Sequence, residues 1–321
     1  MHTASVRAPL PVTVVTGFLG AGKTTLVNRW LAEIPRGDVA VVVNELGTVG
    51  IDGELLADRV RTIVEITGGC VCCASQADLV RALNEIAGSA TPPMRVLVET
   101  SGAASPAGVL RAMSGGGTDS AFALDGVVTV VDATRVDALC RHDLGIEQIG
   151  YADIVVLTRT DTCDRATVDH ATDVVAVHNG AAVLLAAAHG PHAETLEQTL
   201  ALRRSELALP RAAPVTAHPV YESVSLSMDG EVDGERFAEF VESELAPFAG
   251  RIFRTKGILA VAGVDERMIL QGVADTVELT FGEPWANAPR SSRLVVVGYA
   301  LDRGALERGF AACAADMGEP R

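Results

Sequence analysis

The nine residues GFLGAGKTT, from Gly17 to Thr25, constrain the fold more than any other part of the chain. They match the phosphate-loop pattern G-x-x-x-x-G-K-[ST], follow the strand-like run VTVVT and open the helix-like run KTTLVNRWLAEI. Glycines let backbone N–H groups turn toward phosphate oxygens, and a helix N-terminus adds a favourable potential. A glycine-rich turn without a ligand is the alternative, but the flanking strand and helix favour a nucleoside triphosphatase fold.

Each polar residue of this motif has an expected role. The Lys23 ammonium would reach the β- and γ-phosphates, and the Thr24 hydroxyl would bind Mg²⁺. The full set of residues that we expect to bind nucleotide here is Gly17, Gly20, Ala21, Gly22, Lys23, Thr24 and Thr25.

A second Mg²⁺-orienting carboxylate should stand at the end of a neighbouring strand. Glu99 occupies that place in RVLVETSG, and Asp132 at the end of VVTVVDA competes with it. For each, a plain strand-end cap is the alternative. Gly102 follows Glu99 closely, and its backbone could contact a γ-phosphate.

Short, almost wholly apolar runs alternate with helical stretches through the first two hundred residues. Seven runs are strand candidates: 12–16, 39–44, 61–66, 95–100, 126–133, 153–158 and 182–187. Continuous apolarity is typical of parallel strands covered on both faces. The pattern predicts an α/β phosphate-loop domain with a mainly parallel, doubly wound sheet.

A chain of 321 residues suits two domains rather than one. The proline-rich segment LALPRAAPVTAHP breaks the alternation, so we expect a first domain over 1–208 and a second over 209–321. Beyond the break the sequence predicts strands at 221–228, 251–263, 277–281 and 292–300 and helices at 233–245 and 301–313. That is a smaller α+β domain.

The run TRTD, from Thr158 to Asp161, stands where guanine-specific enzymes carry Asn-Lys-x-Asp. Asp161 keeps the carboxylate that accepts two hydrogen bonds from guanine, and the stem of Arg159 can lie across a base. Thr158 does not reproduce the amide contacts of Asn. We expect GTP to be preferred over ATP, with weakened discrimination.

The segment GGCVCC holds three of the six cysteines, Cys70, Cys72 and Cys73. Clustered thiolates are soft ligands that suit Zn²⁺, with Co²⁺ below it in the affinity order. A redox cluster and a cysteine-filled core are the alternatives. The remaining cysteines are scattered, and we expect them to be packing residues.

Composition excludes several kinds of partner. The formal net charge of −15 argues against nucleic acid or an anionic membrane surface, because phosphate binding needs a basic face. The sequence shows no signal-peptide run and no membrane-spanning apolar stretch, so we expect a cytoplasmic protein.

Together these residues resemble the CobW-like metal-chaperone GTPases. The resemblance rests on TGFLGAGKTTLVNRWL, VNELGTVGIDGELL, TGGCVCC and VLVETSGAASP, and in the second domain on FRTKGILAVAG, QGVADTVEL and SSRLVVVGYALD. It covers nearly the whole chain. It implies GTP and Mg²⁺ in the first domain, Zn²⁺ or Co²⁺ at the Cys-x-Cys-Cys motif, and delivery to a client metalloprotein recognised by the second domain. It also favours Glu99 over Asp132 for Mg²⁺. Thr158-Arg159 departs from the family's usual Asn-Lys.

The segment from Asn44 to Asp52 lies where a nucleotide-sensing switch would sit, and Glu45 and Asp52 are candidates to orient the attacking water. Two other functions fit parts of the sequence. One is a phosphate-loop kinase of a small molecule with structural cysteines. The other is a nucleotide-binding metal sensor or reservoir with little turnover. The sequence identifies neither the client nor the oligomeric state.

Overall fold

The structure is a computed structural model, and it describes residues 8–35, 38–44, 63–65, 74–114, 121–186, 196–204, 221–246, 251–273 and 276–315. The chain forms two compact units, one of Met1–Ala171 with Val183–Ala208 and the other of Thr172–Ala182 with Leu209–Arg321. The expected boundary between residues 208 and 209 falls in a stretch outside the described residues, so it stays a prediction.

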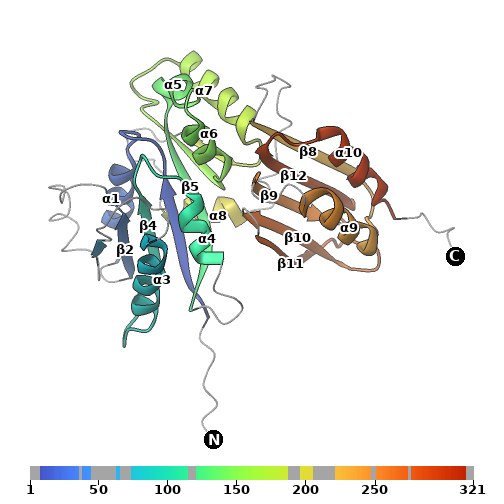
Figure 1. Cartoon of the computed structure of the whole chain (residues 1–321), viewed down its shortest axis with the longest axis horizontal. Helices are drawn as coiled ribbons and strands as arrows, with labels where there is room; N and C mark the ends of the chain where they lie inside the picture. Colours follow the sequence, from blue (N-terminus) through green and yellow to red (C-terminus); the bar gives the residue numbers. More distant parts are fainter. Residues whose placement is uncertain are drawn as a thin grey trace, which may run out of the picture. The chain divides into compact units, whose positions relative to one another are not determined.

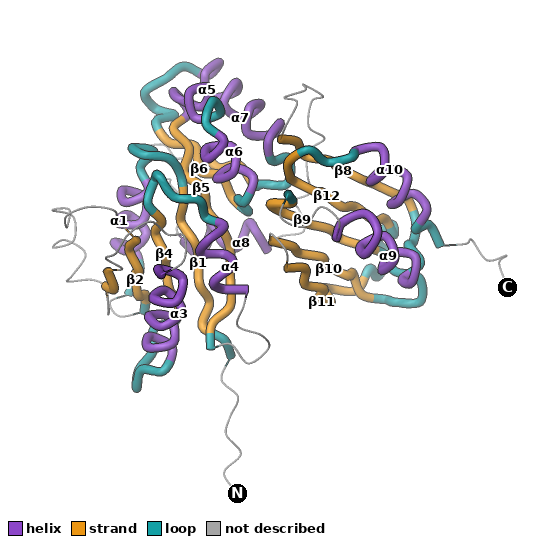
Figure 2. The backbone as a smooth tube through the Cα atoms, viewed as in Figure 1, coloured by secondary structure: helices purple, strands orange, loops and turns teal. Residues whose placement is uncertain are grey.

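The first unit contains a seven-stranded sheet in the order β3-β2-β4-β1-β5-β6-β7 (Figures 1 and 2). Every pair of neighbouring strands in it is parallel. The strands are β1 (Leu10–Thr16), β2 (Val39–Asn44), β3 (Ile63–Glu65), β4 (Arg95–Thr100), β5 (Phe122–Asp132), β6 (Ile154–Thr158) and β7 (Val183–Ala186). The sequence-based prediction of seven strands and a parallel sheet is confirmed.

Helices cover both faces of this sheet. The helices between residues 23 and 204 are α1 (Lys23–Glu33), α3 (Ala74–Ala87), α4 (Ala107–Ser114), α5 (Val136–Leu139), α6 (Asp143–Gly150), α7 (Arg165–His178) and α8 (Leu196–Arg204), with a 3₁₀ turn at Ala133–Arg135. Apolar residues of α1 and α8 form one core cluster with alternate residues of the strands. α3 and α4 contact each other and β5, and Figure 1 shows them together on one side of the sheet. The doubly wound arrangement is confirmed.

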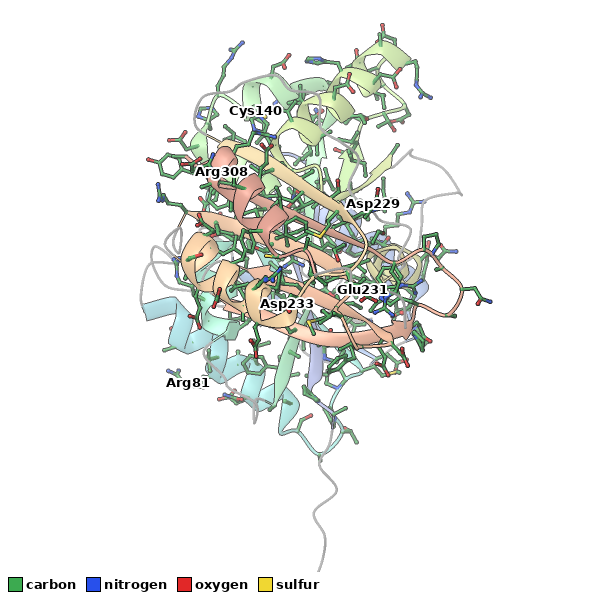
Figure 3. All side chains as sticks on the ribbon, turned by 90° about the vertical axis from the view of Figure 1, so that its right-hand side faces the viewer. Arg81, Cys140, Asp229, Glu231, Asp233 and Arg308 are labelled. Atoms are coloured by element: carbon green, nitrogen blue, oxygen red, sulfur yellow. The ribbon has the colours of Figure 1, made fainter. Side chains whose placement is uncertain are left out.

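The second unit contains a five-stranded antiparallel sheet in the order β11-β10-β9-β12-β8. Its elements are β8 (Tyr221–Asp229), α9 (Gly234–Phe240), a π-helical turn (Val241–Leu245), β9 (Ile252–Leu259), β10 (Glu266–Val273), β11 (Thr276–Pro284), β12 (Ser291–Tyr299) and α10 (Arg303–Ala312). Asp233, labelled in Figure 3, caps α9 by accepting hydrogen bonds from the backbone N–H groups of Glu235 and Arg236. Phenylalanines of α9 and α10 pack on the sheet in one apolar core. The predicted α+β architecture is confirmed, although β10 was not among the predicted strands.

No helix within the ranges given above is both long and apolar enough to cross a lipid bilayer.

Candidate active site

The phosphate loop, residues 17–24, connects β1 to α1 through backbone conformations that favour glycine. Gly17, Gly20 and Gly22 have φ values of 138°, 73° and 100°. At Gly17 a Cβ atom would also lie 2.2 Å from the carbonyl oxygen of Val130 on β5. Glycine is therefore required at this position both by the backbone conformation and by the close approach of β5.

Lys23 lies at the start of α1 and is largely buried, with 9% of its surface exposed. Its Nζ donates to the carbonyl oxygens of Gly17 at 2.9 Å and Phe18 at 3.3 Å, so the ammonium lies across the phosphate loop. A bound phosphate group would compete with these two carbonyl oxygens for the same ammonium. Thr25, the last residue of the motif, is exposed.

Glu99 and Thr24 come together beside this loop. The Thr24 hydroxyl donates to Glu99 Oε1 at 2.7 Å, and the Glu99 carboxylate is buried. Side chains alternate along β4, and Leu97 belongs to the core cluster formed with α1. Glu99, two residues further, therefore points to the same face, where the first turn of α1 lies. A hydroxyl and a buried carboxylate are the oxygen ligands that Mg²⁺ prefers, so these residues fit that ion.

Asp132, the other candidate for Mg²⁺, has different partners. Its Oδ1 accepts hydrogen bonds from the Thr134 backbone N–H at 3.0 Å and the Thr134 hydroxyl at 2.7 Å, which caps the 3₁₀ turn. Its Oδ2 lies 3.0 Å from Arg159 Nη1, in an ion pair whose angles do not make a hydrogen bond. Arg135 lies further away, at 3.8 Å. Asp132 thus acts as a strand-end cap and as the counter-charge of Arg159.

The run TRTD, residues 158–161, which the sequence suggests for base recognition, begins at the end of β6. The Thr158 hydroxyl lies 2.8 Å from the carbonyl oxygen of Ala21 and 3.3 Å from that of Val131, so it ties β6 to the phosphate loop. Arg159 has a φ of 59° and donates from Nη2 to the Gly20 carbonyl oxygen at 3.3 Å. The sequence showed only what Thr158 lacks relative to Asn, whereas the structure shows a contact that its hydroxyl makes.

Asp161, two residues beyond Arg159, is exposed and makes no hydrogen bond or ion pair with any residue that the structure describes. Its carboxylate is therefore available to a ligand from the solvent side.

The loop after β4, residues 101–106, lies against the phosphate loop. A Cβ atom on Gly102 would lie 2.6 Å from the backbone nitrogen of Leu19, so the two loops are in direct backbone contact. At the strand ends the Thr100 hydroxyl donates to the Thr16 hydroxyl at 2.8 Å. The rings of Phe18 and His142 stack with centroids 5.4 Å apart. These side-chain contacts join residues far apart in sequence, and no local pattern indicated them.

Five of the expected site residues lie outside the described residues: Glu45, Asp52, Cys70, Cys72 and Cys73. The described part of the chain contains no group of three His, Cys, Asp or Glu side chains that could hold a metal ion. Burial raises the pKa of the Cys140 thiol to about 12 and that of the Cys313 thiol to about 11, with Asp137 and Asp233 respectively adding to the effect. Both therefore stay thiols at neutral pH, and thiols are poor metal ligands.

A parallel doubly wound sheet with a lysine- and threonine-containing phosphate loop at its first strand defines a phosphate-loop nucleotide-binding protein. The chain belongs to the CobW family: the model of the "CobW/HypB/UreG, nucleotide-binding domain" matches residues 11–185, and that of the "Cobalamin synthesis protein cobW C-terminal domain" matches residues 221–314. The family resemblance found in the sequence is confirmed.

Individual relatives match over nearly their whole length. The chain is 29% identical over 319 residues to the zinc chaperone YjiA of Escherichia coli strain K12, covering 94% of this chain and 98% of that protein. It is 30% identical over 356 residues to the zinc chaperone CobW of Pseudomonas aeruginosa, covering 93% and 90%. The crystal structure of the Zn(II)-bound YjiA GTPase from E. coli superposes with a TM-score of 0.75 at 24% identity, over 96% of this chain and 100% of that one, which shows the same fold.

Proposed function

We propose that this protein is a GTP-dependent metallochaperone. In this proposal Cys70, Cys72 and Cys73 hold Zn²⁺, or Co²⁺, as cargo, and GTP hydrolysis releases the ion to a client metalloprotein. Soft thiolates and the affinity order among divalent ions favour zinc. The matched relatives are named zinc chaperones, which supports delivery of the ion to a client. We propose that the second domain, residues 209–321, recognises that client.

The observation that carries the nucleotide half of the proposal is the buried Glu99–Thr24 pair beside the phosphate loop. Thr24 and Glu99 would hold Mg²⁺, which would supply charge neutralisation at the β- and γ-phosphates. Lys23 would move from the loop carbonyls to these phosphates, and the Gly102 backbone N–H would face the γ-phosphate. Loss of the γ-phosphate would then change contacts at Gly102 and in the segment from Asn44 to Asp52.

The register of the sheet supports a metal site near the nucleotide. Val43 on β2 pairs with Glu99 on β4 and with Glu65 on β3, so all three lie in one row at the carboxyl edge of the sheet. Neighbouring strands are about 4.8 Å apart. Cys70 follows Glu65 by only five residues, and five residues span at most about 18 Å. Cys70, the first residue of the cysteine motif, can therefore lie no more than about 18 Å from Glu65, which is two strands away from Glu99 in the same row.

The base-recognition run supports GTP as the nucleotide. The Asp161 carboxylate is exposed, as a group that accepts hydrogen bonds from a guanine edge must be. Arg159 is held over the loop by Gly20 and Asp132, where its stem would cover one face of the base. In the hydrolysis step a water oxygen bonds to the γ-phosphorus while the bond to the bridging oxygen of GDP breaks. Glu45 and Asp52 are our candidates to orient that water.

Competition titration of zinc tests the proposal. Affinity is measured with Mg²⁺ and either GTPγS or GDP for the wild type, Cys72→Ala and the control Cys140→Ala, whose thiol stays protonated at neutral pH. We expect tighter zinc binding with GTPγS than with GDP in the wild type and in Cys140→Ala, and loss of the tight site in Cys72→Ala. Equal zinc affinity with both nucleotides would instead support a metal reservoir, and absence of zinc binding would support the small-molecule kinase.

A further inference from the structure

Gln148, on α6, is buried at the junction of three parts of the nucleotide domain. Its side-chain Nε2 donates to the carbonyl oxygens of Ala104 at 3.2 Å and Gly102 at 3.4 Å. Its backbone carbonyl oxygen accepts from the Thr129 hydroxyl on β5 at 2.7 Å. One residue thus connects α6, the central sheet and the loop after β4.

The orientation of the Gln148 amide follows from its neighbours. Carbonyl oxygens only accept hydrogen bonds, so the NH₂ group must face Gly102 and Ala104. The Oε1 atom is left buried and has no hydrogen-bond partner among the residues that the structure describes. A buried acceptor without a partner is destabilising. The favourable contribution of this side chain therefore comes from the two bonds that it donates to the loop.

These bonds act on the backbone that lies against the phosphate loop. Gly102 packs so closely on Leu19 that a Cβ atom would lie 2.6 Å from the Leu19 nitrogen. A bond to the Gly102 carbonyl oxygen fixes the peptide that follows Gly102 and limits how far the loop can move from the phosphates. The same loop is also bonded to α6 by the Ser105 hydroxyl, which donates to Glu147 Oε1 at 2.5 Å.

We propose that Gln148 is a positioning residue that holds Gly102 against the phosphate loop, and that it thereby sets the preference of the site for a triphosphate over a diphosphate. The inference rests on the proposed function, in which the Gly102 backbone contacts the γ-phosphate. A diphosphate leaves that position empty, so its binding is insensitive to where Gly102 lies. Only the affinity for the triphosphate depends on the two donated bonds.

The test compares affinities for GTPγS and GDP, with Mg²⁺, in the full-length protein. Gln148→Met keeps the length and burial of the side chain but removes both donors. Thr129→Val is the matched control, because it also removes one buried hydrogen bond at Gln148 without touching the loop after β4. Gly102→Ala tests whether the close approach of the two loops is needed for triphosphate binding, because its Cβ atom would lie 2.6 Å from the Leu19 backbone nitrogen and push the loops apart. The unfolding midpoint of every variant is measured alongside.

We expect Gln148→Met to lower the ratio of GTPγS to GDP affinity about tenfold, while the GDP affinity stays within about twofold. Thr129→Val should lower the unfolding midpoint and leave the ratio unchanged. A purely structural role for Gln148 would give a lower midpoint with an unchanged ratio, and that result overturns the inference. If Gly102→Ala lowers the ratio of GTPγS to GDP affinity while Gln148→Met leaves that ratio unchanged, only the positioning role of Gln148 fails. If the wild type shows no preference for the triphosphate, the proposed γ-phosphate contact fails and the inference fails with it.

Discussion

At the scale of single residues, Glu99 is a buried, negatively charged side chain that accepts a hydrogen bond from the Thr24 hydroxyl on α1. A buried carboxylate is costly unless a hydrogen bond or a cation compensates it. The Thr24 hydroxyl supplies one hydrogen bond at 2.7 Å, and Mg²⁺ would supply the compensating charge. The carboxylate is thus placed to bind a cation beside the phosphate loop.

Glu99→Gln should separate the role of the carboxylate in cation binding from its role in the stability of the fold. The substitution keeps the size of the side chain and removes its charge, so we expect the unfolding midpoint to change little. Mg²⁺-dependent GTP hydrolysis should fall at least about tenfold, because the metal loses its carboxylate ligand. Glu33→Gln, at an exposed position of α1, is the control and should hydrolyse GTP normally. Normal hydrolysis by Glu99→Gln would remove Glu99 from the magnesium site.

Two arginines approach Asp132, and they should differ in their effect on nucleotide binding. Arg159 lies 3.0 Å from the carboxylate and also bonds to the Gly20 carbonyl oxygen. Arg135 is 70% exposed and lies further from the carboxylate, at 3.8 Å. We expect Arg159→Ala to weaken GDP binding about tenfold and Arg135→Ala to leave it unchanged, since exposed ion pairs contribute little. Fluorescence titration with a labelled GDP measures both. Equal effects would mean that Arg159 acts only through the charge of Asp132.

The pKa values of Cys140 and Cys313 predict slow alkylation. Since only the thiolate reacts and burial raises these pKa values to about 12 and about 11, both should be almost entirely protonated at pH 9, where a thiol with the reference pKa of 9.0 is half ionised. Iodoacetamide labelling at pH 9, followed by mass spectrometry of peptides, should show much slower modification of both than of glutathione. Labelling at the rate of glutathione would show that these thiols are not protected by burial.

At the scale of elements, the alternation of side chains along the parallel strands accounts for the site. Residues 97 and 99 of β4, and 130 and 132 of β5, point to the face covered by α1, so Glu99 meets Thr24 at the end of the phosphate loop and Asp132 meets Arg159, which bonds to that loop. Because the motif fixes strand, loop and helix together, the places of Lys23 and Thr24 could be predicted from the sequence. Glu99 was one of two strand-end candidates, and the family resemblance favoured it over Asp132.

Other elements could not be predicted for physical reasons. α6 is short and carries two glycines, and β10 begins with Glu266 and Arg267, so neither shows the expected periodicity. The contact between Gln148 and Gly102 joins residues 46 positions apart, and it depends on how α6 packs. Asp132 was a reasonable magnesium candidate by its place at a strand end. Its pairing with Arg159 became visible only once β5 and β6 were aligned.

The glycines of the phosphate loop give a prediction at this scale. Gly17→Ala would place a Cβ atom 2.2 Å from the Val130 carbonyl oxygen, whereas nothing lies within 4 Å of a Cβ atom on Gly20. We expect Gly17→Ala to destabilise the protein by about 3 kcal/mol through overpacking and to abolish GDP binding. Gly20→Ala should cost only about 1 kcal/mol through its left-handed backbone. Chemical denaturation of both variants tests this, and equal losses would contradict the close packing of Gly17 on β5.

At the scale of the whole molecule, a GTP-dependent metallochaperone needs two sites whose occupancies are coupled. If GTP tightens zinc binding by some factor, zinc must tighten GTP binding by the same factor. The coupling would pass from the γ-phosphate through Gly102 and the segment that follows β2 to the cysteine motif that follows β3. In the proposed function, the second domain would act only when the released ion reaches a client.

The most direct test of this coupling is a single turnover of the zinc-loaded protein with GTP and Mg²⁺. Phosphate release and zinc release to a coloured chelator are followed in the same stopped-flow experiment, with GTPγS in place of GTP as the control. We expect zinc to leave at the rate of phosphate release, and the GTPγS complex to retain its zinc over the same time. Zinc leaving at the same rate with GTPγS as with GTP would show that hydrolysis does not drive zinc release.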